Sequence, residues 1–364
     1  FLLGSNASYL HFRLNFYSVP FAASLMFTTL GLWLWLKATP ERHPGRGEHV
    51  HVGSWSVAGA QPLSLRHLAA GAACIAANFG CRPTFALSAL LCFPIFWPQI
   101  TSLLQGLKSR SLPPRKALRA PAAVIIPALI VVLPLMAYNV ARFGSPLDFG
   151  NDYQMTVTDM TRFVQPTANF LPSVGAYLFL PLRFTSEFPF IGMTPMAFRE
   201  WGYYELMAGG LFATCPLLLL ALAAPFLRRR MHRSGYWGLA TCSLALAVLL
   251  AVFDSHTAGL GWRYICDFGW MMAIAALAPM LYLIHPGGDA IAAGAPDPSE
   301  RNEPRRDVTK RHPMVLACVR GLVVAVLMAS IILAVLACFI PGRDDSLINN
   351  NPVLYDTVVA WFRL

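Results

Sequence analysis

The stretch APAAVIIPALIVVLPLMAY, from Ala120 to Tyr138, contains no charged residue. A helix rises 1.5 Å per residue, so about 20 apolar residues cross the roughly 30 Å hydrocarbon core of a bilayer. The stretch therefore predicts a membrane-spanning helix.

The rest of the chain has the same character. Hydrophobic residues make up 56% of the 364 positions and charged residues 13%, about half the charged share of a soluble globular protein. Apolar stretches of this kind are too numerous for one buried core or one signal peptide. They predict spanning helices near 17–36, 119–139, 204–227, 235–253, 263–284 and 313–340.

The stretch 67–98 is apolar but carries Asn78, Gly80, Arg82 and Pro83 near its middle. An arginine at the centre of one long spanning helix is unfavourable, and proline interrupts a helix. Two short helices that turn at Phe79–Pro83 instead place Arg82 at an interface. The fold class expected is all-α, a polytopic integral membrane protein with about eight transmembrane helices and one long extracytoplasmic loop.

The positive charges fall on one side of this topology. One side, with the snorkelling Arg320, holds 19 of the 28 Lys and Arg and 7 of the 18 Asp and Glu. By the positive-inside rule that side is the cytoplasm of a multi-pass plasma-membrane protein. The net charge of +10 thus indicates membrane lipid as a partner, not nucleic acid. The cytoplasmic loops expected are 37–66, 99–119, 228–234 and 285–312.

This topology predicts two regions. Residues 1–340 form a multi-helix transmembrane domain with an outer loop, 140–203, and a flexible cytoplasmic linker, 285–312. Residues 341–364 form a short extracytoplasmic segment. A loop longer than about 15 residues is usually functional or disordered, and the aromatic content of 140–203 argues against disorder. We expect short helices lying against the membrane there, over 168–183.

The eight cysteines are scattered singly, and no pair has metal-ligand spacing. We expect them to pack as small apolar side chains, and no metal ligands are assigned.

Three groups of polar residues lie at the predicted outer surface. Arg82 follows a short apolar helix; its guanidinium could hold a phosphate with two hydrogen bonds, or it could simply snorkel and anchor the turn. Arg263 and Asp267 open a later helix after Asp254-Ser255-His256, of which His256 is expected to be a surface residue. Asp267 lies one turn after Arg263, so an intrahelical ion pair is the alternative to a functional partner.

The third group follows the helix at 119–139 and is interrupted by Gly144-Ser145-Pro146. It could bind an acceptor or a sugar, with Asp148 and Asp152 as the candidates for a catalytic carboxylate. Alternatively, Asn139 and Asp148 could merely cap the helix and the turn. Its candidates are Asn139, Arg142, Asp148, Asp152, Tyr153 and Gln154.

Together the motifs CRPT (81–84), NVARFGSPLDFG (139–150) and RYICDF (263–268) resemble bacterial membrane glycosyltransferases of the GT-C superfamily. The order and spacing of the motifs fit over most of residues 1–340. The resemblance implies transfer of a sugar from a polyprenyl-phosphate donor to an extracytoplasmic glycan, lipid or protein acceptor. The arginines Arg82, Arg142 and Arg263 would then face the phosphate, and Asp148 and Asp152 would bind the acceptor or a divalent cation such as Mg or Mn.

Such enzymes carry a catalytic acidic residue in their first outer loop, but residues 1–16 contain no Asp or Glu. We therefore expect the catalytic base upstream of Phe1. The alternative function is a transporter or flippase of a lipid-linked or small polar substrate, which would need polar residues near the bilayer midplane.

Overall fold

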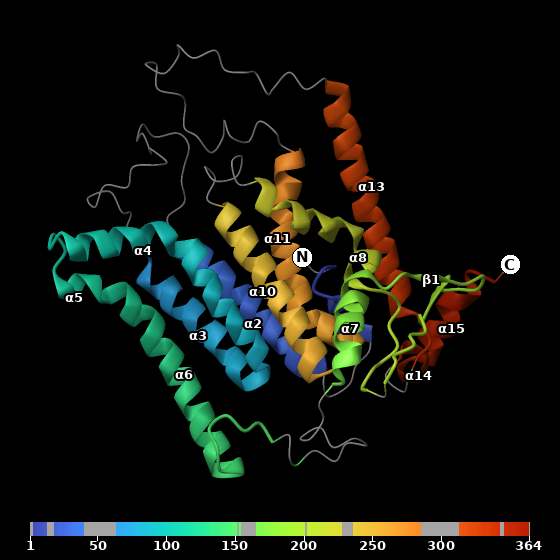
Figure 1. The fold of residues 1–364 in the computed structure, drawn as a ribbon, viewed down its shortest axis with the longest axis horizontal. Helices are drawn as coiled ribbons and strands as arrows, with labels where there is room; N and C mark the ends of the chain where they lie inside the picture. The colour runs from blue at the N-terminus through green and yellow to red at the C-terminus, as the bar shows by residue number, and fades with distance from the viewer. Residues whose placement is uncertain are drawn as a thin grey trace.

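The structure, a computed structural model, describes residues 3–12, 18–39, 63–150, 153, 165–200, 202–227, 236–284, 313–342 and 346–363. Within these ranges the chain is mostly helical (Figure 1). The first half contains α1 (Ala7–Phe12), α2 (Ser18–Ala38), α3 (Leu65–Cys81), the 3₁₀ helix η1 (Pro83–Leu91), α4 (Cys92–Lys108), α5 (Pro114–Ala117), α6 (Arg119–Phe143) and α7 (Thr167–Phe179). The second half contains strands β1 (Arg183–Phe184) and β2 (Ile191–Gly192), α8 (Leu211–Thr214), the 3₁₀ helices η3 (Pro216–Ala223), η4 (Pro225–Leu227) and η6 (Trp262–Tyr264), α10 (Tyr236–Thr257), α11 (Ile265–Ile284), α13 (Pro313–Cys338), α14 (Leu347–Asn350) and α15 (Pro352–Ala360).

The described residues include six helices long and apolar enough to cross a membrane, so the protein is membrane-embedded. They are Ser18–Ala38, Pro83–Lys108, Arg119–Phe143, Trp237–Thr257, Trp262–Leu281 and Ala317–Cys338. They match the predicted stretches near 17–36, 119–139, 235–253, 263–284 and 313–340, and the second half of 67–98.

The break predicted within 67–98 is confirmed at Arg82. Its backbone is extended, with φ −147° and ψ 105°, between the end of α3 and the start of η1. Pro83 explains this, because the ring of a proline disfavours the helical region for the residue before it. The Arg82 N–H still donates to the carbonyl of Asn78, which closes the last turn of α3.

The continuous helix predicted over 204–227 is wrong. Tyr204 forms an isolated bridge with Leu260, and only short helical segments follow it, namely α8, η3 and η4. Proline begins both 3₁₀ segments, at Pro216 and Pro225, where it removes a backbone donor and clashes with the preceding turn. Apolar composition alone did not reveal these breaks. The described residues also contain the two-residue strands β1 and β2, which pair antiparallel, but the fold is mostly helical, in agreement with the all-α expectation.

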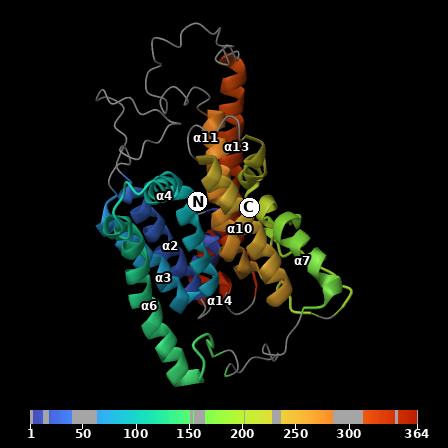
Figure 2. The same ribbon diagram turned by 60° about the vertical axis from the view of Figure 1, so that its left-hand side comes forward.

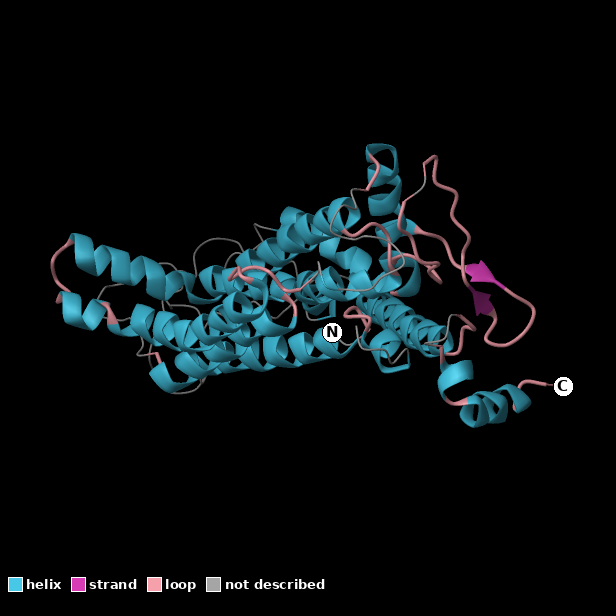
Figure 3. Cartoon of the chain, turned by 90° about the horizontal axis from the view of Figure 1, so that it is seen from below, coloured by secondary structure: helices cyan, strands magenta, loops and turns pink. Residues whose placement is uncertain are grey.

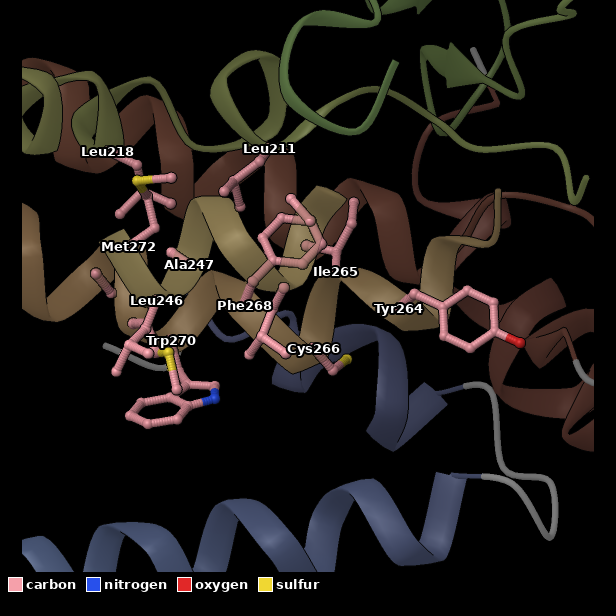
Figure 4. Packing of buried hydrophobic residues seen from close by; sticks show 14 of the residues in the cluster. Leu211, Leu218, Leu246, Ala247, Tyr264, Ile265, Cys266, Phe268, Trp270 and Met272 are labelled. Atoms are coloured by element: carbon pink, nitrogen blue, oxygen red, sulfur yellow. The ribbon is translucent and has the colours of Figure 1, made fainter. Parts of the chain in front are cut away.

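The core is built around α11. Of the apolar stretch within Trp262–Leu281, which includes most of α11, 72% is buried inside the protein. None of the corresponding apolar stretch of α6 is buried. Both views place α6 at the edge of the bundle (Figures 1 and 2). Phe268 and Met272 of α11 lie close to Leu211 and Leu218, whereas Trp270 points the other way (Figure 4), where it stacks on Phe85 at a centroid distance of 5.9 Å. The segment that contains α8 and η3 thus packs in the core.

Helices α2 and α3 pack closely because glycines face each other. A Cβ atom added at Gly71 would lie 2.4 Å from Trp35, and one added at Gly31 would lie 2.6 Å from Ile75. Small residues of this kind let helix backbones approach in a membrane. The indole of Trp35 also donates to the carbonyl of Leu68 at 3.2 Å.

The segment after α6 contains a helix close to the range expected, because α7 covers most of 168–183. Gly144 ends α6 in the left-handed conformation, with φ +80°, and its N–H donates to Val140. Seen from below, the β1–β2 hairpin and α15 extend beyond the helical bundle (Figure 3).

Candidate functional site

Among the described residues, a buried ion pair joins Arg82 at the end of α3 to Asp267 of α11. Nε and Nη2 of Arg82 donate to Oδ1 and Oδ2 of Asp267, both at 2.5 Å, and the Thr84 hydroxyl donates to Oδ1 at 2.8 Å. Asp267 is fully buried, and the Arg82 side chain is 23% exposed. The guanidinium also lies 3.9 Å from the centroid of the Phe21 ring, a cation–π contact. A planar guanidinium suits this two-point contact, which a lysine cannot make.

Asp267 therefore pairs with a residue 185 positions away and not with Arg263. The intrahelical alternative is not formed in the structure. Helix α11 instead presents Asp267 to the turn at which α3 ends. Both residues were candidates from the sequence, but their pairing was not predicted.

A second carboxylate, Asp254, lies near the end of α10 and is 2% exposed. It interacts electrostatically with both Asp267 and Arg82. Its Oδ2 atom has no hydrogen-bond partner. A hydrogen bond links the Asp254 side chain to Asp267, and two carboxyl groups can share one only when one of them carries a proton. The sequence pointed to the DSH stretch at 254–256 but gave Asp254 no role, because a lone aspartate near a helix end is usually exposed.

Arg263 forms the second ion pair. Its Nη1 lies 3.2 Å from Oε1 of Glu205, and its Nη2 donates to the Tyr203 hydroxyl at 2.9 Å. That hydroxyl in turn donates to Oε1 of Glu205 at 2.8 Å. Burial, together with the charge of Glu205, raises the pKa of Tyr203. The phenol thus stays protonated and can donate at any physiological pH. Tyr203 and Glu205 were not expected, because they fall in and beside the stretch predicted to be an apolar helix.

Tyr264 brings the two ion pairs together. The guanidinium carbon of Arg82 lies 5.4 Å from the centroid of its ring, and that of Arg263 lies 5.1 Å away. In Figure 4 this ring lies apart from Trp270 and Met272, at the start of α11. Two arginines from distant parts of the sequence thus converge on one aromatic ring.

The connection between α10 and α11 holds this arrangement in place. The Tyr177 hydroxyl donates to the Gly259 carbonyl at 2.9 Å and accepts from the Gly261 N–H at 3.0 Å. Glu205 N–H donates to the Leu260 carbonyl at 2.8 Å, so the 203–205 segment is tied to the same turn. Gly259 has φ +82°, which only glycine adopts without strain. Burial raises the pKa of Tyr177, so it remains a donor.

Buried amides lie next to this turn. Gln165 is 1% exposed, and neither its Oε1 nor its Nε2 has a hydrogen-bond partner. A Cβ atom at Gly259 would lie 3.3 Å from Gln165 Oε1, and one at Gly202 would lie 2.7 Å from it. Asn169 donates to the Glu200 carbonyl at 2.8 Å, but its Oδ1 is unpartnered. Side-chain amides bind sugar hydroxyls well, since they both donate and accept. No pattern in the sequence distinguished these amides.

The candidates after α6 occupy a separate turn. Asn139 donates to the Pro146 carbonyl at 3.2 Å, and Arg142 donates to the Tyr138 hydroxyl at 2.7 Å. Oδ1 of Asp148 accepts from the Gly150 N–H at 2.7 Å, as in an Asx turn. These contacts are those of the alternative in which the residues cap the helix and turn.

The same turn is attached to the end of α3. The rings of Phe149 and Phe79 lie 5.3 Å apart, and Tyr153 contacts Phe143 at 5.4 Å. Within the described ranges no hydrogen bond or ion pair joins the turn to Arg82 or Arg263. Asp152 and Gln154 lie outside the described residues.

The described residues contain no group of three or more His, Cys, Asp or Glu side chains that could hold a metal ion. All eight cysteines are free.

A scan against protein-family models found no match, and searches of curated proteins and of solved structures found none either.

Proposed function

We propose that this protein is a membrane glycosyltransferase of the GT-C type, which takes a sugar from a polyprenyl-phosphate donor at the outer face of the plasma membrane. The observation that carries the proposal is the convergence of Arg82 and Arg263 on Tyr264, where α3 ends and α11 begins. Guanidinium groups stabilise the charge of a departing lipid phosphate. The proposed acceptor is an extracytoplasmic glycan, lipid or protein.

The proposed topology has eight crossings. The six long helices supply six of them. Helix α3, at 17 residues, supplies the seventh, and the broken segment of α8, η3 and η4 supplies the eighth. With the loops 37–66 and 285–312 in the cytoplasm, Arg82, Asp267 and Arg263 then lie near the outer leaflet, and 140–203 is extracytoplasmic.

Arg263 is the better phosphate ligand of the two. The Arg82 guanidinium is committed to Asp267 through two hydrogen bonds, so we assign it to holding α3 and α11 in register and to supplying positive potential. Arg263 is paired with Glu205, and because that carboxylate also accepts from Tyr203, it is divided between two donors. The buried amides of Gln165 and Asn169 would then accept and donate to sugar hydroxyls.

The transporter alternative has less support. The buried charged residues of the described ranges gather at one end of the bundle, near the ends of α3 and α10 and the start of α11. A carrier that alternates its access uses polar groups near the midplane instead.

Lipid binding tests the proposal. The chain in lipid nanodiscs is titrated with a polyprenyl phosphate, and binding is followed by native mass spectrometry. We expect the double variant Arg263→Gln with Glu205→Gln to weaken binding about tenfold, which corresponds to about 1.4 kcal/mol. The double variant leaves no buried carboxylate unpaired. The matched control is the double variant Arg199→Gln with Glu200→Gln, which also removes one positive and one negative charge, at two exposed positions.

Equal loss of binding in the two double variants would show that the effect is not specific to Arg263 and Glu205, and would overturn the assignment. Wild-type binding in both would also overturn it. Transport of an intact lipid-linked sugar in proteoliposomes, with no sugar transferred, would favour the alternative function.

A further inference from the structure

The β1–β2 hairpin and the C-terminal helices form one unit, which is held together by four phenylalanines. Phe188 of the hairpin stacks on Phe362 at a centroid distance of 4.6 Å and contacts Phe339 at 5.3 Å. Phe190 contacts Phe362 at 5.9 Å. Phe339 comes directly after the last residue of α13, so the unit is fixed to the end of a spanning helix.

The unit exposes large apolar side chains. Phe184 is 73% exposed, Val353 76% and Trp361 74%. Val353 near the start of α15 and Trp361 directly after its last residue are exposed, whereas Tyr355 and Val358 of α15 are buried. The unit therefore packs on the protein with some of its large apolar side chains and leaves others exposed.

The position of the unit indicates what surrounds the exposed side chains of Phe184, Val353 and Trp361. Figures 1 and 3 show the hairpin and α15 beside the end of α13 and extending sideways from the bundle, not over its ends. Residues that extend sideways from the end of a spanning helix lie at the surface of the bilayer around the protein. Water alone would leave these three side chains exposed at an unfavourable free energy.

We propose that the hairpin and α15 form an interfacial platform that rests in the leaflet at the end of α13, with the exposed aromatic residues among the lipid headgroups. Tryptophan is enriched at this depth because its ring is apolar and its N–H is polar. Arg183 and Arg363 are exposed next to Phe184 and Trp361, where they can contact lipid phosphates. An amphipathic surface helix that lies in the interface plane has these features.

Depth-dependent fluorescence quenching tests the platform. The protein is reconstituted into phosphatidylcholine bilayers that contain lipids brominated either near the carbonyl groups or near the chain ends. The contribution of Trp361 is the wild-type signal minus that of Trp361→Phe. We expect shallow bromines to quench it about twofold more than deep bromines, and aqueous iodide to quench it weakly.

Ile130 is the matched control position, because it is 66% exposed and lies near the middle of the Arg119–Phe143 span. The signal gained in Ile130→Trp should respond most to deep bromines. Strong quenching of Trp361 by iodide with none by either lipid would overturn the proposal. Protection from all three quenchers, together with a dimer in solution that Trp361→Glu disrupts, would assign the face to a second copy and would also overturn it.

Discussion

Asp267 and Asp254 offer the sharpest test of how the buried charges are balanced. Both carboxylates lie near Arg82, but only Asp267 accepts its two N–H groups. One guanidinium balances one carboxylate. Replacing each aspartate in turn by asparagine, which keeps the size of the side chain, should therefore destabilise the protein to different extents.

Asp267→Asn breaks the ion pair. Removing one partner of a buried pair destabilises a protein by about 3–5 kcal/mol. The lower end applies here, because the Arg82 side chain is 23% exposed, keeps its contact with Phe21 and still interacts electrostatically with Asp254. We expect a loss of about 3 kcal/mol. At about 2 °C per kcal/mol for a large domain, Tm should fall by about 6 °C.

Asp254→Asn leaves the ion pair intact, and its amide N–H can donate to Asp267 in place of the hydrogen bond that the carboxyl group makes. This exchange should leave the free energy of unfolding within about 1 kcal/mol of wild type. Thermal unfolding in detergent, followed by intrinsic fluorescence at one fixed scan rate, measures both variants. Arg142→Gln serves as a control for loss of an exposed charge and should change Tm little.

The reasoning fails if Asp254→Asn lowers Tm as much as Asp267→Asn does, because the two carboxylates would then share Arg82 equally. An unchanged Tm in Asp267→Asn would show that the bidentate pair does not stabilise the fold.

Three further outcomes are expected. Tyr177→Phe should lower the free energy of unfolding by about 1–3 kcal/mol in the same thermal assay, because it leaves a buried backbone N–H and C=O unpaired; wild-type Tm would contradict this. Gly71→Ala should separate α2 from α3 and lower Tm, since its Cβ would meet Trp35 at 2.4 Å, whereas Gly321→Ala, which meets nothing within 4 Å, should not. In a cysteine-free background, a cysteine at Ser109 should react with a membrane-impermeant maleimide only from the cytoplasm; labelling from outside would refute the hairpin at 67–98.

The sequence by itself determined the class of protein and most of its helices. Bilayer thickness fixes how many apolar residues a spanning segment needs, and that count can be read from a single sequence. The break at Arg82 could also be predicted, because Pro83 acts on its immediate neighbour through local steric contact. The predicted helix over 204–227 failed since hydropathy does not register how Pro216 and Pro225 divide an apolar run into 3₁₀ segments.

Only the tertiary structure decided which charges meet. From the sequence, Asp267 had one partner within a helical turn, Arg263, yet it binds Arg82 185 positions away, while Arg263 binds Glu205. The close approach of distant helix ends depends on how α3, α10 and α11 pack, and no periodicity in the chain encodes that distance. Where charge is buried, pairing is selected by the geometry of the whole bundle, because an unpaired buried charge destabilises the fold by more than any local preference can offset.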